Sequence, residues 1–186
     1  MIDVSLKARL GKNKEKIVLE LEKQGAKIKK GKESIDRVFI KSNFLNDFKQ
    51  NQDFKFYNDS ILEIRKEDDK TFLCLKKKTE KDGKFIKLES LVSDEEEIVE
   101  IIKLIGFEEI FEIKKKRTKY LLKGLSINID YIENLDYFIE INTTVSNEKE
   151  EDIVRINIEN IFESVGIKKD EYILDSYESL MYKNRK

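Results

Sequence analysis

The sequence contains no histidine, no proline and no tryptophan, and it has a single cysteine, Cys74. Without histidine there is no Ser-His-Asp triad, no Cys-His pair and no histidine-ligated zinc site. One thiol forms neither an internal disulfide nor a thiolate metal cage. A metal site would therefore consist of oxygen ligands, which suit Mg²⁺, Mn²⁺ or Ca²⁺.

Long apolar runs and an excess of one charge are also missing. No stretch approaches the roughly 18 apolar residues that span a bilayer, and the N-terminus lacks a signal-peptide core. With 37 Lys+Arg against 38 Asp+Glu, the chain is not the basic protein expected of a general nucleic-acid binder. Because 39% of its residues are hydrophobic, we expect one folded, cytoplasmic domain over residues 1–186.

Apolar periodicity predicts an α+β fold in which short connections favour antiparallel strands. Eight such strands can close into a β-barrel wide enough for a small ligand. Strands are expected at about 2–10, 33–41, 60–67, 71–78, 84–91, 109–121, 125–131 and 137–143, with hairpin turns at 68–70 and 81–83. Helices are expected from Asn13 to about Gln24, from a capping box at Ser93 to Gly106, from Ser146 or Asn147 to Gly166, and in the tail near 175–180.

Two details of this prediction concern segments whose pattern is less regular. Residues 42–58 are interpreted as a loop, in which Phe44, Leu45 and Phe48 either anchor the chain or form a helical turn. The two longer central helices are expected to turn their isoleucines inward. These inward residues are Ile98, Ile101, Ile102 and Ile105 in the first helix, and Ile153, Ile156, Ile161 and Val165 in the second.

The polar positions of the predicted strands carry charges of both signs. Two interpretations are open. In the first, these residues form the solvated outer face of a half-exposed sheet, which is what alternating charges usually indicate. In the second, they line the interior of a barrel. In the second case lysines and arginines would bind a polyanion, while carboxylates would hold its divalent metal ion. Periodicity alone does not separate these alternatives.

A series of strand motifs favours the interior. The opening Asp3-Val4-Ser5-Leu6-Lys7 is similar to an ExExK strand. The motifs that follow it are Asp36-Arg37-Val38-Phe39, Leu62-Glu63-Ile64-Arg65, Leu73-Cys74-Leu75-Lys76, Lys87-Leu88-Glu89, Lys114-Lys115-Lys116-Arg117, Ile129-Asp130, Phe138-Ile139-Glu140 and Ser176-Tyr177-Glu178-Ser179-Leu180. Their order and spacing resemble the CYTH family of triphosphate tunnel enzymes over nearly the whole chain, and the tail is most similar to its class IV adenylyl cyclase branch.

The resemblance implies a closed tunnel of eight antiparallel strands flanked by helices. It implies a small-molecule triphosphate as partner (ATP, thiamine triphosphate or tripolyphosphate), Mg²⁺ or Mn²⁺ as cofactor, and catalytic roles for Lys7 and Glu140. Homodimers are common in the family, although no dimer face is evident in the sequence. The triphosphate-binding residues implied are Lys7, Arg65, Lys76, Lys87, Lys115 and Arg117, and the metal ligands implied are Asp3, Glu89, Asp130 and Glu140.

Four positions depart from the family pattern. Glu63 stands where an arginine is usual, so it removes a phosphate ligand and adds repulsion, unless it takes over a metal or pairs with Lys76 or Lys87. The other departures each remove a family glutamate, and they are Ser5, Leu91 and Asn142. Losing several carboxylates weakens at least one metal site.

Three further side chains have structural interpretations beside the functional ones. Asp36 pairs with Arg37 or with a turn amide, and Tyr177 packs on the barrel wall. Cys74 is interpreted as a small residue lining the core rather than as a nucleophile.

The leading hypothesis is an enzyme that converts ATP to cyclic AMP and pyrophosphate. Its alternatives are a triphosphatase acting on thiamine triphosphate or inorganic triphosphate, and a binding module that has lost turnover together with its carboxylates. A barrel without a ligand is disfavoured, because inward cations without an anion are costly.

Overall fold

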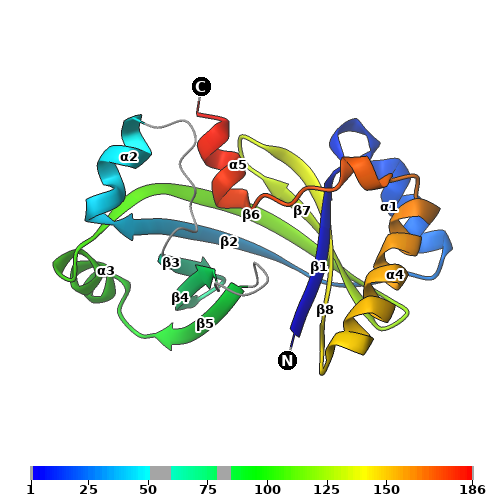
Figure 1. Ribbon diagram of the computed structural model, residues 1–186, viewed down its shortest axis with the longest axis horizontal. Helices are drawn as coiled ribbons and strands as arrows, with labels where there is room; N and C mark the ends of the chain where they lie inside the picture. Colours follow the sequence, from blue (N-terminus) through cyan, green and yellow to red (C-terminus); the bar gives the residue numbers. More distant parts are fainter. Residues whose placement is uncertain (1, 51–59, 79–84, 186) are drawn as a thin grey trace. The chain divides into compact units, whose positions relative to one another are not determined.

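The computed structural model of the protein describes residues 2–50, 60–78 and 85–185 (Figure 1). Within these ranges the chain forms eight strands, five α-helices and three short 3₁₀ helices. The strands are β1 (Ile2–Arg9), β2 (Lys27–Lys41), β3 (Ser60–Glu67), β4 (Lys70–Lys78), β5 (Phe85–Val92), β6 (Phe107–Leu122), β7 (Leu125–Ile132) and β8 (Asp136–Val145). The helices are η1 (Gly11–Asn13), α1 (Lys14–Lys23), η2 (Ser42–Phe44), α2 (Leu45–Gln50), α3 (Glu95–Leu104), α4 (Glu148–Ser164), η3 (Lys169–Glu171) and α5 (Tyr177–Lys183).

The strands form one sheet in the order β1-β8-β7-β6-β2-β3-β4-β5. Each ladder whose register is described is antiparallel. The predicted α+β fold with an eight-stranded antiparallel sheet is therefore confirmed. Its closure into a barrel is not, because β1 and β5 end the strand order and no described ladder joins them.

The chain divides into two compact units. The first unit comprises residues 1–32 and 116–175, and the second comprises residues 33–115 and 176–186. The strands β2 and β6 run through both units, whereas every helix belongs to one. The single domain expected over residues 1–186 stays a prediction.

In the first unit, one face of the β1–β8–β7 sheet is apolar and is covered by α1 and α4. Val4, Leu6 and Ala8 of β1 are buried against Ile158 and Phe162 of α4 in one hydrophobic cluster. Figure 1 shows α4, in orange, lying beside β1 and β8. Because strand side chains alternate between faces, the polar residues of β1 project from the side opposite this core.

In the second unit, α3 covers one face of the β2–β3–β4–β5 sheet. Phe39 of β2 and Ile64 of β3 pack with Val99 and Ile102 of α3 in a second cluster. Arg37 lies on this helix-covered face, where its guanidinium contacts Glu95 Oε1 at 3.1 Å and Glu109 Oε2 at 2.6 Å. The other face of the same strands is left for the polar residues.

The strand and helix boundaries agree with the sequence prediction, with three exceptions. β2 begins at Lys27 instead of 33, because a run of lysines and a glycine hides its alternation. Residues 42–50 form η2 and α2 instead of a loop, while residues 51–58 and the predicted turn at 81–83 lie outside the described residues. The N-cap of α3 is Asp94, whose side chain accepts from the Glu97 amide, and not Ser93.

The predicted inward faces of the two long helices are partly wrong. In α3 the buried residues are Val99 and Ile102, whereas Ile101 and Ile105 are 45% and 63% exposed. In α4 the buried stripe contains Ile158, Ile161, Phe162 and Val165. Ile153 and Ile156 are exposed instead. Isoleucines occur on more than one side of both helices, so their presence alone does not identify the core face.

This correction predicts unequal costs for two identical substitutions, one in α3 and one at its C-cap, Ile105. Ile102→Ala should lower the free energy of unfolding by about 3 kcal/mol, because it empties a buried site. Ile105→Ala should cost less than about 0.5 kcal/mol, because Ile105 is exposed. Urea unfolding of both variants measures the difference, and an equal or larger loss for Ile105→Ala would contradict the assigned buried face of α3.

Candidate functional site

The charged face of the first unit is organised by strand register. Lys7 of β1 lies directly opposite Glu140 of β8, which in turn lies opposite Asn128 of β7. Directly opposed residues of antiparallel strands project on the same side. The two residues that the family resemblance implies to be catalytic, Lys7 and Glu140, are therefore cross-strand neighbours.

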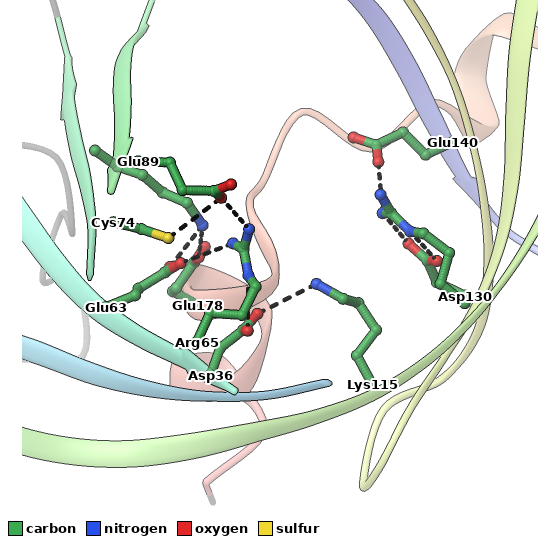
Figure 2. Close-up of polar contacts among 11 residues, drawn as sticks. Asp36, Glu63, Arg65, Cys74, Glu89, Lys115, Asp130, Glu140 and Glu178 are labelled. Carbon is green, nitrogen blue, oxygen red and sulfur yellow. Dashed lines mark hydrogen bonds and ion pairs between the residues drawn. The ribbon is translucent and has the colours of Figure 1, made fainter. Parts of the chain in front are cut away.

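Arg117 joins two of the predicted metal ligands on this face. Its guanidinium contacts both oxygens of Asp130, at 2.6 and 2.5 Å, and Glu140 Oε2 at 2.9 Å. The Asp130 side chain is fully buried, so it requires a partner of opposite charge. Figure 2 shows Asp130 and Glu140 converging on this one cation.

Lys7 contacts the segment that follows the last long helix of the first unit. Its Nζ donates to the Asp175 carbonyl oxygen at 2.7 Å. Arg9, two residues along β1, donates to the Leu135 carbonyl oxygen at 3.3 Å. The side chain of Asp3, the remaining predicted ligand in this unit, lies outside the described residues.

The charged face of the second unit contains a buried carboxylate held by two cations. Asp36 Oδ1 accepts from Arg65 at 2.9 Å, and its Oδ2 accepts from Lys115 at 3.2 Å. Burial opposes ionisation of Asp36, but the charges of Lys115 and Arg65 outweigh it and lower its pKa. The expected pairing of Asp36 with Arg37 is wrong, since Arg37 projects from the opposite face.

Beside this pair lies a group that we call the Lys76 triad, formed by Glu63, Lys76 and Glu178. Lys76 Nζ contacts Glu63 Oε1 at 2.5 Å and Glu178 Oε1 at 2.6 Å (Figure 2). Arg65 adds a contact to Glu63 Oε2 at 3.3 Å. Of the alternatives predicted for Glu63, pairing with Lys76 is confirmed. No role was predicted for Glu178 from the sequence, because the short segment around it has no hydrophobic periodicity that would indicate which side chains are buried.

The two carboxyl groups of the Lys76 triad share one proton unequally. Burial raises the pKa of Glu63 to about 8, against the charge of Lys76 and aided by the charge of Glu178. Burial opposes ionisation of Glu178 too, but Lys76 and a hydrogen bond from Glu63 hold its pKa well below the usual range. Near neutral pH, Glu63 therefore carries the proton and Glu178 the negative charge.

The next strand adds Glu89, another predicted metal ligand. Its Oε2 accepts from Arg65 Nη1 at 2.9 Å and lies 3.5 Å from Cys74 Sγ. Burial raises the pKa of the Cys74 thiol to about 12, so the thiol stays protonated and is not a nucleophile. Lys87 lies directly opposite Lys76 in the β4–β5 register, and two opposed like charges favour an anion close by.

Ser34 contributes a polar atom to the same face. It lies two residues before Asp36 on β2, so the two side chains project on the same side. Ser34 Oγ is buried and has no hydrogen-bond partner within the described part of the chain. A buried hydroxyl of this kind is costly unless water or a ligand satisfies it.

Each unit thus brings together part of the predicted site. Arg117, Asp130 and Glu140 are in contact in the first unit, and Arg65, Lys76 and Lys115 share carboxylate partners in the second. No group of three or more acidic or thiol side chains that could hold a metal ion is found among the described residues. The oxygen donors of Asp130 and Glu140 still fit Mg²⁺, which commonly takes one or two carboxylates and completes its shell with water and phosphate oxygens.

The raised pKa of Glu63 predicts a specific pH dependence of stability. A glutamate has a pKa near 4.5 when unfolded, so between pH 4.5 and 8 the folded state holds the extra proton. The free energy of unfolding should therefore fall by about 2 kcal/mol from pH 6 to pH 8.5. Glu178 and Asp36, with lowered pKa values, do not titrate in this window.

Urea unfolding of Glu63→Gln measures this effect, because glutamine is neutral at both pH values. The variant should lose most of the decrease, whereas Glu112→Gln, which changes an exposed carboxylate of β6, should retain it. The same decrease in all three proteins would show that another group carries the titration.

Comparison with known proteins places these features in a family. The family model for the CYTH domain matches residues 1–177. A Methanocaldococcus jannaschii protein named "Putative adenylate cyclase" is 32% identical over 185 residues, covering 97% of this chain and 98% of its own. A solved Vibrio parahaemolyticus protein described in the same words has a TM-score of 0.75 at 14% identity, covering 97% of this chain and 98% of its own.

A solved Hippeastrum protein, described as revealing a dominant triphosphatase activity, has a TM-score of 0.61 at 17% identity and covers 96% of this chain and 93% of its own. In the described residues no helix has the length and apolar character needed to cross a membrane. The family match over most of the sequence and the close relative covering nearly all of it lead to one conclusion. The chain belongs to the CYTH family.

Proposed function

We propose that this protein is a metal-dependent enzyme acting on a triphosphate compound, and that its principal reaction is the cyclisation of ATP to cyclic AMP and pyrophosphate. The observation that carries the proposal is the sorting of charge onto one face of each unit, with cations and carboxylates at the positions that the family uses. The M. jannaschii relative and its name support the cyclase over other triphosphate reactions.

Each charged face offers cations that would bind phosphate. In the second unit, Arg65 and Lys115 already hold the Asp36 carboxylate, so their donors are oriented toward oxygen acceptors. In the first unit, Arg117 offers a planar fork, which contacts both Asp130 oxygens and matches the geometry of phosphate equally well. Preorganised cations of this kind stabilise the charge that develops on a leaving pyrophosphate.

Lys7 and Glu140 would act as a neighbouring pair in the chemical step. The Lys7 ammonium donates to a carbonyl oxygen, which suits a positive charge and not a proton acceptor. Glu140 would then accept the proton as the ribose 3′-oxygen bonds to the α-phosphorus and the bond to pyrophosphate breaks. Asp130 and Glu140 would hold Mg²⁺ or Mn²⁺, which supplies further neutralisation of phosphate charge when bound.

Hydrolysis of a triphosphate is the second candidate function. It uses the same cradle of cations, with water in place of the ribose hydroxyl as the nucleophile. The description of the Hippeastrum protein, which shares the fold, favours this alternative. The Lys76 triad affects both candidate reactions equally. The carboxyl groups beside Lys76 would weaken phosphate binding there and so slow either reaction.

The purified chain should be incubated with ATP, thiamine triphosphate and tripolyphosphate, each with Mg²⁺ and with Mn²⁺. Product analysis by ³¹P nuclear magnetic resonance separates the candidates: cyclic AMP with pyrophosphate indicates the cyclase, and free phosphate indicates the hydrolase. Binding without product would leave a binding module. If none of the three compounds is bound or turned over, the proposed function is wrong.

A single substitution then links the activity to the charged face. Lys115→Met should lower kcat/KM about 100-fold, because it removes a preorganised cation while Asp36 keeps its contact with Arg65. Lys114→Met is the matched control, since Lys114 is the exposed neighbour on the opposite side of β6. Equal effects of the two substitutions would contradict the assigned role of Lys115.

A further inference from the structure

The Lys76 triad contains a carboxylate at a position where the proposed function needs a phosphate. Lys76 directs its ammonium at two buried carboxyl groups, at 2.5 and 2.6 Å. The side chains of Glu63 and Glu178 are 0% and 4% exposed, so water screens the negative charge of Glu178 little. Two of the three N–H donors of Lys76 are thus taken by oxygen atoms of the chain itself.

The two carboxyl groups differ in how firmly the chain holds them. Glu63 lies in the middle of β3, between two strands, and also contacts Arg65. Glu178 lies in the first turn of α5, a helix of seven residues near the end of the chain. A helix of seven residues makes fewer backbone hydrogen bonds than a strand paired on both sides, so Glu178 is the group that an incoming anion can replace.

The remainder of α5 is fixed to the second unit independently of Glu178. Tyr182 Oη donates to the Phe48 carbonyl oxygen at 2.9 Å, and its ring lies 4.9 Å from that of Phe48. Arg185 donates to the Ile110 carbonyl oxygen at 2.6 Å and lies over the Phe111 ring. The C-terminal part of α5 is therefore held in place even when the first turn, which contains Glu178, moves.

We propose that Glu178 is an internal competitor, whose carboxylate occupies the phosphate position at Lys76 and must be displaced by a bound polyphosphate. The inference rests on the proposed function, because it assumes that Lys76 binds phosphate. It makes Glu178 a specificity-determining residue: only an anion that contacts Lys76 more strongly than a tethered carboxylate gains that contact. A singly charged anion does not outcompete Glu178, whereas a polyphosphate with several charges does.

Calorimetric titration with tripolyphosphate, without divalent metal, tests this competition. Glu178→Gln should bind tripolyphosphate about tenfold more tightly than the wild type, because it keeps the shape of the side chain and removes its charge. Glu112→Gln, which removes an exposed charge of the same unit, should change the affinity less than twofold. Unchanged or weaker binding by Glu178→Gln would overturn the inference.

A double-mutant cycle separates this inference from the proposed function. Lys76→Met alone should weaken binding, and Glu178→Gln should add nothing in the Lys76→Met background. If Lys76→Met has no effect, the phosphate-binding role of Lys76 fails. If it weakens binding while Glu178→Gln still tightens binding in its presence, the effect of Glu178 is a general field effect and the competition is wrong. No binding by either the wild type or Glu178→Gln overturns both.

Hydrogen exchange of the wild-type protein provides a measurement that needs no variant. Displacement of Glu178 should accelerate amide exchange in the first turn of α5 when tripolyphosphate is added, by at least about fivefold. A purely structural role of Glu178 predicts equal or slower exchange, since ligands generally protect the elements they contact. Equal or slower exchange in this turn would therefore reject the proposal even if Lys76→Met fails to fold.

Discussion

The fold depends on one electrostatic constraint: a charge on a buried sheet face needs an opposite charge within a few ångströms. Asp130 meets this requirement through Arg117, and Asp36 meets it through Arg65 and Lys115. In both units one face of the sheet packs against helices through apolar side chains, and most of the paired charges lie on the other face. Arg37 is an exception on the helix-covered face, where it pairs with Glu95 and Glu109.

The departures from the family pattern remove carboxylates from one part of the sheet and add them in another. Ser5 and Asn142, which replace two family glutamates, lie directly opposite each other in the β1–β8 register. This cross-strand pair of positions therefore carries no carboxylate on either strand. In the second unit the change is the reverse, because Glu63 adds a carboxylate and Glu178 supplies another to the same ammonium.

The sequence predicted most of this fold because strands with alternating polarity have a clear signal. The bounds predicted for β3, residues 60–67, are those found, and the glycines at 106 and 166 end helices with φ of 89° and 84°. The start of β2 was missed because lysines occupy both faces of a strand that is exposed over residues 27–33. The inward faces of α3 and α4 were partly wrong because isoleucine is abundant on exposed sides as well.

The candidate site was predictable wherever two residues share a strand or a motif, and not where contacts join distant parts of the chain. The positions of Arg65, Lys76 and Lys115 follow from their strands. The contact of Lys76 with Glu178 links residues 102 positions apart, and periodicity contains no information about such a pair. The importance of this contact depends on the proposed phosphate-binding role of Lys76, because the added acids lie beside that cation. Under that proposal, a protein that retains Lys76 and neutralises it internally alters the anion selectivity of this charged face while keeping the cation itself.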